Sequence, residues 1–345
     1  MSVALAYWPP IPGLRFRRLQ RPEDDAVISG LLNSGNAADD VPRRVSAAQI
    51  ASWLDHPSNL ELAEDLLIAE VDGVPIAYAE AGWELDNDGG RNYSTWGQVH
   101  PGWRRRGLGT AMLRWVEERQ ARVAATHAAG IDMRMQSWVN DTEVGRIALL
   151  EAHDYAIVRY DHEMERPNLD EIPDLPLPEG IELRPAREED LRRFFETEVE
   201  VFRDHWGAID DSDAAFEQMR ADPRRDVGLW VVAWQGDEIV GQALNRIDRE
   251  ANAELGLKRG WVNSVGVRAP WRRRGIARAL VAESLRVLRD AGMTTAGLGV
   301  DAENPHGALG VYQSVGFAVA RSGRVYRKPL SPATDPELIA RSRTS

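Results

Sequence analysis

Apolar and polar positions follow the same order in the two halves of the chain. Each half opens with a short strand-like run and continues with a helical stretch that begins on acidic residues, at 14–19 and 24–33 and again at 181–184 and 188–202. Two apolar runs then flank a turn, at 66–71 and 75–81 in the first half and at 229–234 and 239–244 in the second. The turns carry Asp72 with Gly73 and Gly236 with Asp237, pairs that are typical of β-hairpins.

The remaining elements also occur once in each half. We expect a strand, an amphipathic helix, a second strand, a second helix and a last strand, at 93–99, 107–121, 131–138, 142–152 and 156–164, and again at 261–267, 275–290, 295–301, 305–315 and 318–327. A mixed, mostly antiparallel sheet flanked by helices is the natural way to bury these apolar faces. The pattern therefore predicts an α/β (α+β) protein with two tandem copies of one fold.

A repeated segment supports this duplication. The stretch VHPGWRRRGLGTAML at 99–113 matches VRAPWRRRGIARALV at 267–281, so Trp103 corresponds to Trp271. Between the halves, Pro173, Pro176 and Pro178 disfavour a helix. We therefore predict an N-terminal domain over 1–168, an extended linker over 169–179, a C-terminal domain over 180–330 and a polar tail over 331–345.

Composition and charge exclude several classes of function. The 345 residues carry a net charge of −12, which argues against broad binding to nucleic acids or anionic membranes. The chain has no cysteine and therefore no disulfide and no thiolate metal site, and no metal is expected. No long apolar run and no basic leader is present, so we expect neither a membrane span nor a secretory signal, and the cytoplasm is the expected location.

The repeated Arg-Gly segment has the chemistry of an anion site. In the second copy a strand ends, the chain turns, and a helix opens at Gly275 and Ala277. The first amides of a helix lack internal partners and carry partial positive charge, and small residues let a ligand approach them. Arg272, Arg273 and Arg274 add charge, so a pyrophosphate is the expected ligand, although a solvated basic turn would have the same composition. Neither copy has the residues of a P-loop or of a Rossmann fingerprint.

In this context the chain resembles the GNAT superfamily of acyl-CoA N-acetyltransferases, whose signature is Gln/Arg-x-x-Gly-x-Gly/Ala. The resemblance covers almost the whole chain twice, with Arg104, Gly107 and Gly109 in the first half and Arg272, Gly275 and Ala277 in the second. It implies acetyl-CoA as co-substrate. The implied binding residues are Val99, Arg104, Arg105, Arg106, Gly107, Leu108, Gly109 and Thr110, and Val265, Gly266, Val267, Arg272, Arg273, Arg274, Gly275, Ile276, Ala277 and Asn304.

The stretch from Asn304 to Phe317 resembles a second signature of the family, Asn-x-x-Ala-x-x-x-Tyr-x-x-x-Gly-Phe, nearly residue for residue, with one extra residue between Asn304 and Ala308. A phenol near the acyl-CoA sulfur can protonate the leaving thiolate, which makes Tyr312 the candidate general acid. A helix-face aromatic that packs into the core would have the same position. In the first half the matching residue is Leu150, which has no proton to donate, although His153 lies nearby. We therefore expect the first half to be a degenerate domain.

The general base is not evident from the sequence. Many members of the family carry a glutamate twelve residues before the motif glycine, and here that position holds Asn263 in the second half and Thr95 in the first. Asn263 occupies the expected catalytic position but cannot act as a base. The amine must then lose its proton through water or to another group, for which the candidates are Glu238, Asp301, Glu303, Asp204 and His205.

These observations predict an N-acetyltransferase that moves an acetyl group directly to a primary amine of a small molecule or a protein, at the C-terminal domain. The segment from Val201 to Trp206 is loosely similar to the mycothiol synthases, a tandem branch of the family that acetylates a cysteinyl amine on a glucosamine-inositol. The alternative is a non-catalytic acyl-CoA sensor on the same fold. The sequence leaves the acceptor open, and equally the choice between a monomer and a homodimer.

Overall fold

The computed structural model describes residues 3–128, 130–207, 209–304 and 307–331, which form two compact units. The first unit comprises Met1–Val158 and Arg324–Ser345, and the second comprises Arg159–Gly323. The long strands β7 (Ala156–Arg166) and β14 (Ala318–Pro329) each contribute residues to both units. The domain limits that the repeat suggests remain a prediction.

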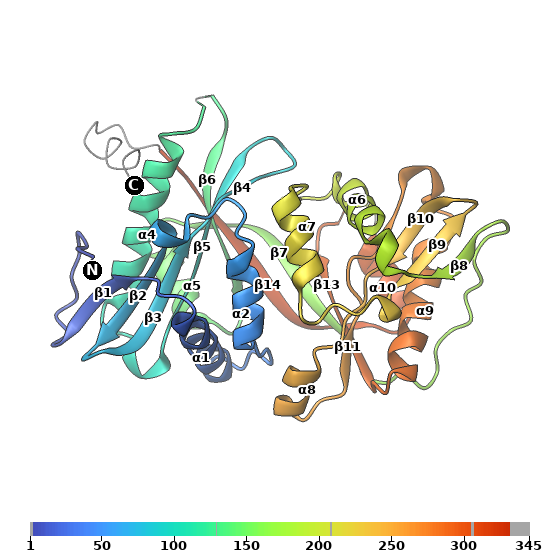
Figure 1. The fold of residues 1–345 in the computed structure, drawn as a ribbon, viewed down its shortest axis with the longest axis horizontal. Coiled ribbons are helices and arrows are strands. Elements are labelled where there is room, and N and C mark those ends of the chain that lie inside the picture. Colours follow the sequence, from blue (N-terminus) through green and yellow to red (C-terminus); the bar gives the residue numbers. More distant parts are fainter. Residues whose placement is uncertain (1–2, 129, 208, 305–306, 332–345) are drawn as a thin grey trace. The chain divides into compact units, whose positions relative to one another are not determined.

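The first unit is a mixed sheet with helices on both faces (Figure 1). Its strand order is β1-β2-β3-β5-β6-β14, and β5 and β6 run parallel. The elements other than the two shared strands are β1 (Leu14–Arg18), α1 (Glu23–Ala38), α2 (Ala47–Asp55), α3 (Leu62–Asp65), β2 (Leu66–Val71), β3 (Val74–Ala81), β4 (Glu84–Leu85), β5 (Arg91–Val99), α4 (Leu108–Ala124), β6 (Met133–Asn140) and α5 (Val144–Glu151).

Alternation along the strands of the first unit builds an apolar core on each face of the sheet. Leu67 and Ala69 of β2 pack in one cluster with Met112 of α4. Their neighbours Leu66 and Ile68 pack with α1 and α2 on the other side. Because successive strand residues point to opposite faces, one strand serves both cores.

The second unit contains two short sheets. One has the order β12-β10-β9-β8, and in the other β13 lies between β7 and β11. Its elements are β8 (Glu182–Pro185), α6 (Leu191–Phe202), α7 (Asp213–Ala221), β9 (Val231–Gln235), β10 (Glu238–Ala243), α8 (Arg249–Leu255), β11 (Arg259–Trp261), β12 (Gly266–Val267), α9 (Ile276–Asp290), β13 (Thr295–Asp301) and α10 (Ala308–Ser314).

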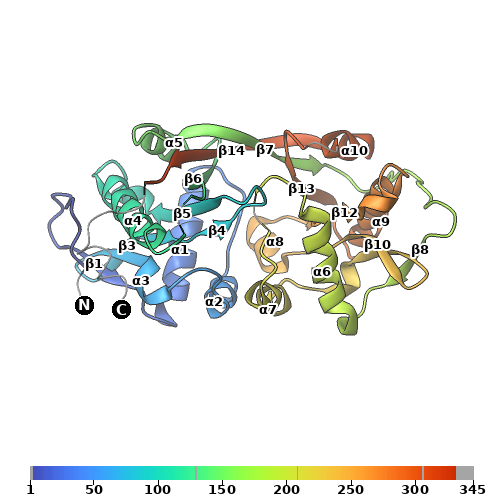
Figure 2. The same ribbon diagram turned by 90° about the horizontal axis from the view of Figure 1, so that it is seen from above.

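Helices α6 and α9 cover opposite faces of the four-stranded sheet (Figure 2). Val231 and Ala233 of β9 lie in a cluster with Ile276 and Leu280 of α9. Val232, the residue between them, lies in the cluster that contains α6 residues. Packing against the sheet therefore fixes where the start of α9 and the end of α6 lie relative to β10 and β12.

The predicted α/β class is confirmed, and most predicted elements agree with the structure to within a few residues. The exception that matters is the continuous strand expected over 261–267, which is wrong. β11 ends at Trp261 and pairs with β13, whereas β12 begins at Gly266 and pairs with β10. Ser264 between them has φ 48°. The two strand segments thus follow different neighbours and diverge, whereas β5 in the first half runs without a break.

The structure also contains helices that the sequence pattern did not predict. α2, α7 and α8 each begin at a residue whose side chain accepts from a backbone amide, namely Ser46, Ser212 and Asp248. Such N-caps replace hydrogen bonds that the first turn of a helix lacks. The predicted helix over 305–315 is seen as Ala308–Ser314, and 305–306 lie outside the described residues. The predicted tail lies outside them too, apart from Ser331.

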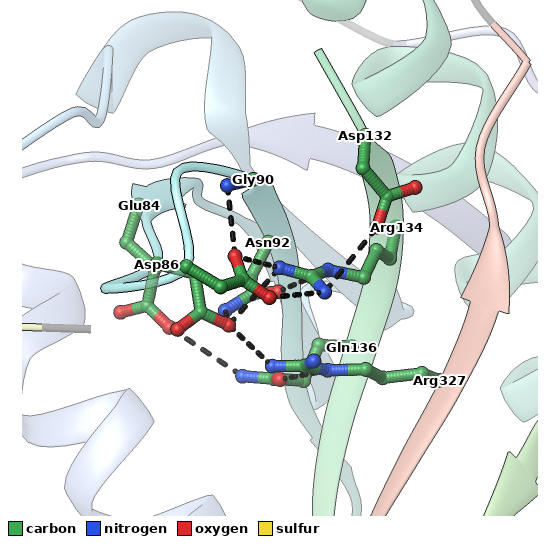
Figure 3. A network of polar contacts seen from close by, with 9 residues as sticks. Glu84, Asp86, Gly90, Asn92, Asp132, Arg134, Gln136 and Arg327 are labelled. Carbon is green, nitrogen blue, oxygen red and sulfur yellow. Dashed lines mark hydrogen bonds and ion pairs between the residues drawn. The ribbon is translucent and has the colours of Figure 1, made fainter. Parts of the chain in front are cut away.

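A buried carboxylate fixes the end of β14 in the first unit (Figure 3). The side chain of Asp86 is 3% exposed and accepts from Arg327 Nη2 at 2.7 Å and from Asn92 Nδ2 at 2.9 Å. Arg134 also contacts it, at 3.1 Å. Arg327 Nε donates to Gln136 Oε1 on β6 at 2.8 Å. The network thereby ties β14 to the loop after β4 and to β6.

No helix in the described part of the chain is long and apolar enough to cross a membrane. Across residues 3–128, 130–207, 209–304 and 307–331, no group of three or more His, Asp or Glu side chains is arranged to hold a metal ion.

Candidate active site

The broken strand of the second unit forms one wall of a cavity of about 790 Å³. The end of α6, the Arg-Gly turn and α10 form the other walls. Of the second-half residues expected to bind the co-substrate or to take part in catalysis, all but Arg274 line this cavity. The lining residues among them are Asn263, Val265, Gly266, Val267, Arg272, Arg273, Gly275, Ile276, Ala277, Asn304 and Tyr312. Of the candidate bases, Asp301 and His205 line it, whereas Asp204, Glu238 and Glu303 do not.

The Arg-Gly turn presents the start of α9 to this cavity. Gly275 is the N-cap of α9, with φ 84°, a left-handed conformation that favours glycine. A Cβ built on Gly275 would have no described heavy atom within 4 Å, so the space over the turn is open. Arg272 holds the turn by donating from Nε to the Val267 carbonyl at 3.0 Å and by an ion pair with Asp204 at 3.2 Å. The free amides of the first helical turn and the neighbouring guanidinium groups form a site for an anion.

The first half repeats this turn almost contact for contact. Gly107 is the N-cap of α4 with φ 82°, and Arg104 Nε donates to the Val99 carbonyl at 3.3 Å. Arg104 also forms a two-pronged ion pair with Asp39, at 2.7 and 2.8 Å. The backbone conformation that the repeated motif requires is therefore present in both units.

The space over the first turn is filled. A Cβ on Gly107 would lie 3.0 Å from the hydroxyl of Tyr7 and 3.6 Å from the side chain of Pro9. The guanidinium of Arg114 stacks on the Tyr7 ring at 5.2 Å. The N-terminal segment thus packs against the start of α4, at the place that is open over Gly275.

Tyr312 lies on α10 with its ring in the core and its side chain on the cavity wall. The residue is 8% exposed, and its ring meets Phe317 edge-on at 6.3 Å. Burial raises the pKa of the phenol to about 12, so it is protonated at neutral pH. Within the described residues, no hydrogen bond to the hydroxyl occurs. The ring therefore packs into the core while the side chain also borders the cavity, and the role of Tyr312 as a general acid stays a prediction.

The correspondence between Tyr312 and Leu150 follows from the backbone. The Phe317 amide donates to the Tyr312 carbonyl at 3.1 Å, and the Tyr155 amide donates to the Leu150 carbonyl at the same distance. Leu150 is buried in the core of the first unit. The first unit therefore has an aliphatic side chain where the second has a phenol.

All four carboxylates proposed from the sequence as bases form ion pairs with arginine. Asp301 lines the cavity but accepts both arms of Arg159, at 2.9 and 2.8 Å. The other three are paired as well: Asp204 with Arg272, Glu303 with Arg159 and Glu238 with Arg268. His205 lines the cavity, with its ring 4.6 Å from that of Phe202.

Sequence reasoning missed Glu198, which lines the cavity from α6. Its Oε1 accepts from Ser264 Oγ at 2.5 Å, in the gap between β11 and β12. Burial raises the pKa of Glu198, and the Ser264 hydrogen bond lowers it in part. One signal was available: Glu198 lies four residues after the buried Phe194 and four before Phe202, on the apolar side of the helix.

Comparisons with known proteins agree with this geometry. The model of the Acetyltransferase (GNAT) family matches residues 38–153 and 188–317. A mycothiol acetyltransferase of Geodermatophilus obscurus is 28% identical over 305 residues, which cover 86% of this chain and 91% of that protein. One from Thermomonospora curvata is 29% identical over 269 residues, covering 76% and 82%.

Solved structures with the same fold include a GCN5-related N-acetyltransferase from Sphaerobacter thermophilus, at 29% identity, with a TM-score of 0.68 and coverage of 93% of this chain and 97% of that one. A tandem GNAT protein from the clavulanic acid biosynthesis pathway aligns with a TM-score of 0.67 at 16% identity, over 93% and 99%. The family model covers well over half of the sequence, once in each half. The chain therefore belongs to the GNAT acetyltransferase family and is an acyltransferase.

Proposed function

We propose that the chain transfers the acetyl group of acetyl-CoA to the primary amine of a small molecule, in the cavity of the second unit. The observation that carries the proposal is the joint lining of one cavity by the open Gly275 turn and by Tyr312. The turn suits a diphosphate and the phenol suits a departing thiolate. The diphosphate and the thioester sulfur of acetyl-CoA would thus each have a partner in the same cavity.

The donor would bind through backbone and guanidinium groups. The amides at the start of α9 would receive the pyrophosphate, with Arg272 and Arg273 beside them. The divergence of β11 and β12 would leave backbone groups of Ser264 and Val265 for an extended arm, since the Val262 amide already donates to Gly297 and the Asn263 carbonyl already accepts from Leu244. This use of an open strand edge follows the general chemistry of strand addition.

Tyr312 would act on the leaving sulfur. Full proton transfer from a phenol of pKa about 12 to a thiolate of pKa about 8.5 would cost about 5 kcal/mol. The phenol therefore stabilises the sulfur first as a hydrogen-bond donor. Its proton moves to sulfur as the attacking nitrogen gives up its own second proton, so no free phenolate accumulates.

The first unit would take no part in the chemistry. It has Leu150 in place of Tyr312, and Tyr7 and Pro9 cover its turn. We propose that its role is structural.

The acceptor is proposed as a small-molecule amine because the curated relatives are named mycothiol acetyltransferases. Phe202, His205 and Trp206 beside the cavity give the acceptor a mainly aromatic surface.

Two substitutions test the proposal. Gly275→Glu adds bulk and negative charge where the pyrophosphate would lie, so we expect no binding of acetyl-CoA by isothermal titration calorimetry. Tyr312→Phe keeps the core packing but removes the proton donor. With amines that support CoA release by the wild type, the rate of CoA release should fall by about 100-fold or more, while the affinity for acetyl-CoA should be unchanged. Wild-type binding of acetyl-CoA without CoA release would instead indicate a sensor.

A further inference from the structure

We infer that Glu198, held by the Ser264 hydroxyl, is the general base that takes the proton from the acceptor amine. The inference rests on the proposed function, because it assigns a role within that same cavity. Glu198 would supply the carboxylate that is missing at position 263. Many enzymes of the family carry a glutamate at that position, whereas this chain has Asn263, which cannot accept a proton at neutral pH.

The position of Glu198 follows from the broken strand. Between β11 and β12 the chain turns at Ser264, which has φ 48°. This turn brings the Ser264 hydroxyl onto Glu198 Oε1 at 2.5 Å, across the gap from α6. In the first unit β5 is continuous, although it too changes partner, from β6 over Arg91–Ser94 to β3 over Thr95–Val99. The same local feature thus opens the cavity and fixes the carboxylate on its wall.

Glu198 differs from the other acids at the cavity in its partners. Asp301 accepts hydrogen bonds from two nitrogens of Arg159, so both of its oxygens are engaged in an ion pair. Glu198 accepts a hydrogen bond from a neutral hydroxyl, and within the described residues it forms no ion pair. One oxygen is oriented by Ser264, and the second remains to accept a proton.

Charged and titratable groups on every wall face the same cavity. They are His205 after α6, Asp301 and Tyr312 on the opposite side, and Arg272, Arg273 and Arg278 at the turn. The arginines lie at the proposed phosphate end. Burial moves the pKa of Glu198 upward from its usual value, toward the range in which a carboxylate is a more effective base.

The proton balance of the reaction is then complete. Glu198 takes one proton from the ammonium group, and the nitrogen lone pair forms the C–N bond to the acetyl carbonyl carbon. The C–S bond breaks, and sulfur leaves with the electron pair and receives the Tyr312 proton. The second proton of the nitrogen restores Tyr312, and Glu198 releases its proton to solvent. The products are the N-acetyl amide, CoA thiol and one proton.

The test compares Glu198→Gln with Glu196→Gln in the full chain. Glu196 lies on the same helix, is exposed and pairs with Arg192, so it is a matched control. Thiol release from acetyl-CoA is measured with tyramine, glucosamine and cysteine as amine probes, and with water alone. We expect Glu198→Gln to lower kcat by about 100-fold or more while the Kd for acetyl-CoA stays within twofold, and Glu196→Gln to leave both unchanged.

Two further readouts separate a base from a structural residue. In the wild type, kcat/KM should fall at low pH as Glu198 is protonated, and this limb should be lost in Glu198→Gln. Ser264→Ala should move the limb to higher pH, because it removes a hydrogen bond that stabilises the carboxylate. Added formate should restore part of the rate to Glu198→Ala.

The outcomes distinguish a failure of the role assigned to Glu198 from a failure of the proposed function. Full thiol release by Glu198→Gln, with an unchanged low-pH limb, overturns the role of Glu198 and leaves the transferase intact. Absence of thiol release by the wild type, with every probe and with water, overturns the proposed function and this inference with it. A loss of rate accompanied by a lost acetyl-CoA affinity would show that Glu198 supports the fold of the site and is not its base.

Discussion

At the scale of single residues, the environment of a carboxylate decides what it can do. Asp301 and Glu198 border the same cavity, yet Asp301 is held by a guanidinium and Glu198 by a hydroxyl. Glu80 on β3 is a third case, 5% exposed in the first unit. Burial, and secondarily Asp65, raise the pKa of Glu80 to about 8. A carboxyl in that state is neutral across most of the physiological range.

Glu80 makes the stability of the chain depend on pH. Its pKa is about 8 in the folded state and about 4.5 unfolded, so folding takes up a proton between these values. The stabilisation that protonated Glu80 gives to the folded state is complete below about pH 4.5. As the pH rises to about 8 this stabilisation is lost, and the unfolding equilibrium constant increases by up to about tenfold per pH unit. Glu80→Gln removes this loss.

Urea unfolding followed by circular dichroism at pH 5, 6, 7 and 8 tests this. The midpoint of Glu80→Gln should exceed that of the wild type by an amount that grows with pH. The exposed Glu118 on α4 supplies a control, because Glu118→Gln should give a difference that does not change with pH. A constant difference for Glu80→Gln as well would mean that Glu80 is ionised in the folded protein.

Single residues also show what could be predicted from the sequence. The Gly275 turn and Tyr312 were identifiable because their neighbours match a motif residue by residue. Glu198 was not, because its chemistry depends on Ser264, 66 positions away and in a left-handed conformation. Apolar periodicity gives the face on which a side chain lies, but it contains no information about which distant hydroxyl meets it.

At the scale of elements, the same limit applies to strand pairing. The alternation in 156–164 and 318–327 predicts strands, and β7 and β14 are present. It does not predict that residues 159–166 contribute to the second unit and residues 324–329 to the first. A period of two specifies the two faces of a strand, whereas the choice of neighbour depends on cross-strand contacts and register. The break between β11 and β12 was missed because residues 262–265, Val-Asn-Ser-Val, contain neither the glycine nor the proline that usually marks an interrupted strand.

The end of β14 depends on Asp86. Asp86→Asn keeps the shape but leaves Arg327, which is 9% exposed, without its carboxylate. Removing one partner of a buried ion pair costs about 3–5 kcal/mol, so the urea midpoint should fall clearly. Asp88, 56% exposed and paired with Arg134 in the same network, is the control, and Asp88→Asn should cost less than about 1 kcal/mol. Equal effects of the two substitutions would contradict this account of Figure 3.

At the scale of the whole molecule, the two halves share one turn, which is open in the second half and covered in the first. Gly107 and Gly275 have nearly the same φ, and Arg104 and Arg272 donate to equivalent carbonyls. The first half has an unbroken β5, a leucine in place of the phenol, and Tyr7 against its turn. Under the proposed function, the leucine removes the proton donor and Tyr7 covers the anion site.

The chain should therefore bind one acetyl-CoA, at the second half. Isothermal titration calorimetry should give one site per chain for the wild type and for Gly107→Glu, and none for Gly275→Glu. The two glycines are a matched pair, because both have a φ near 80° and a glutamate would strain both equally. Any difference between the variants then reports on the ligand and not on the backbone.

Turnover gives the same comparison a second readout. Gly107→Glu should keep kcat within about twofold, since Tyr7 already covers that turn and a side chain there displaces only the N-terminal segment. If the wild type bound two acetyl-CoA molecules and Gly107→Glu removed one of these sites, acetyl-CoA would have to displace Tyr7 from the first turn. A large fall in kcat for a folded Gly107→Glu would mean that the first half takes part in the reaction despite Leu150. Because the turn at Gly275 is open and the turn at Gly107 is covered, we expect one site per chain, and we expect only Gly275→Glu to remove it.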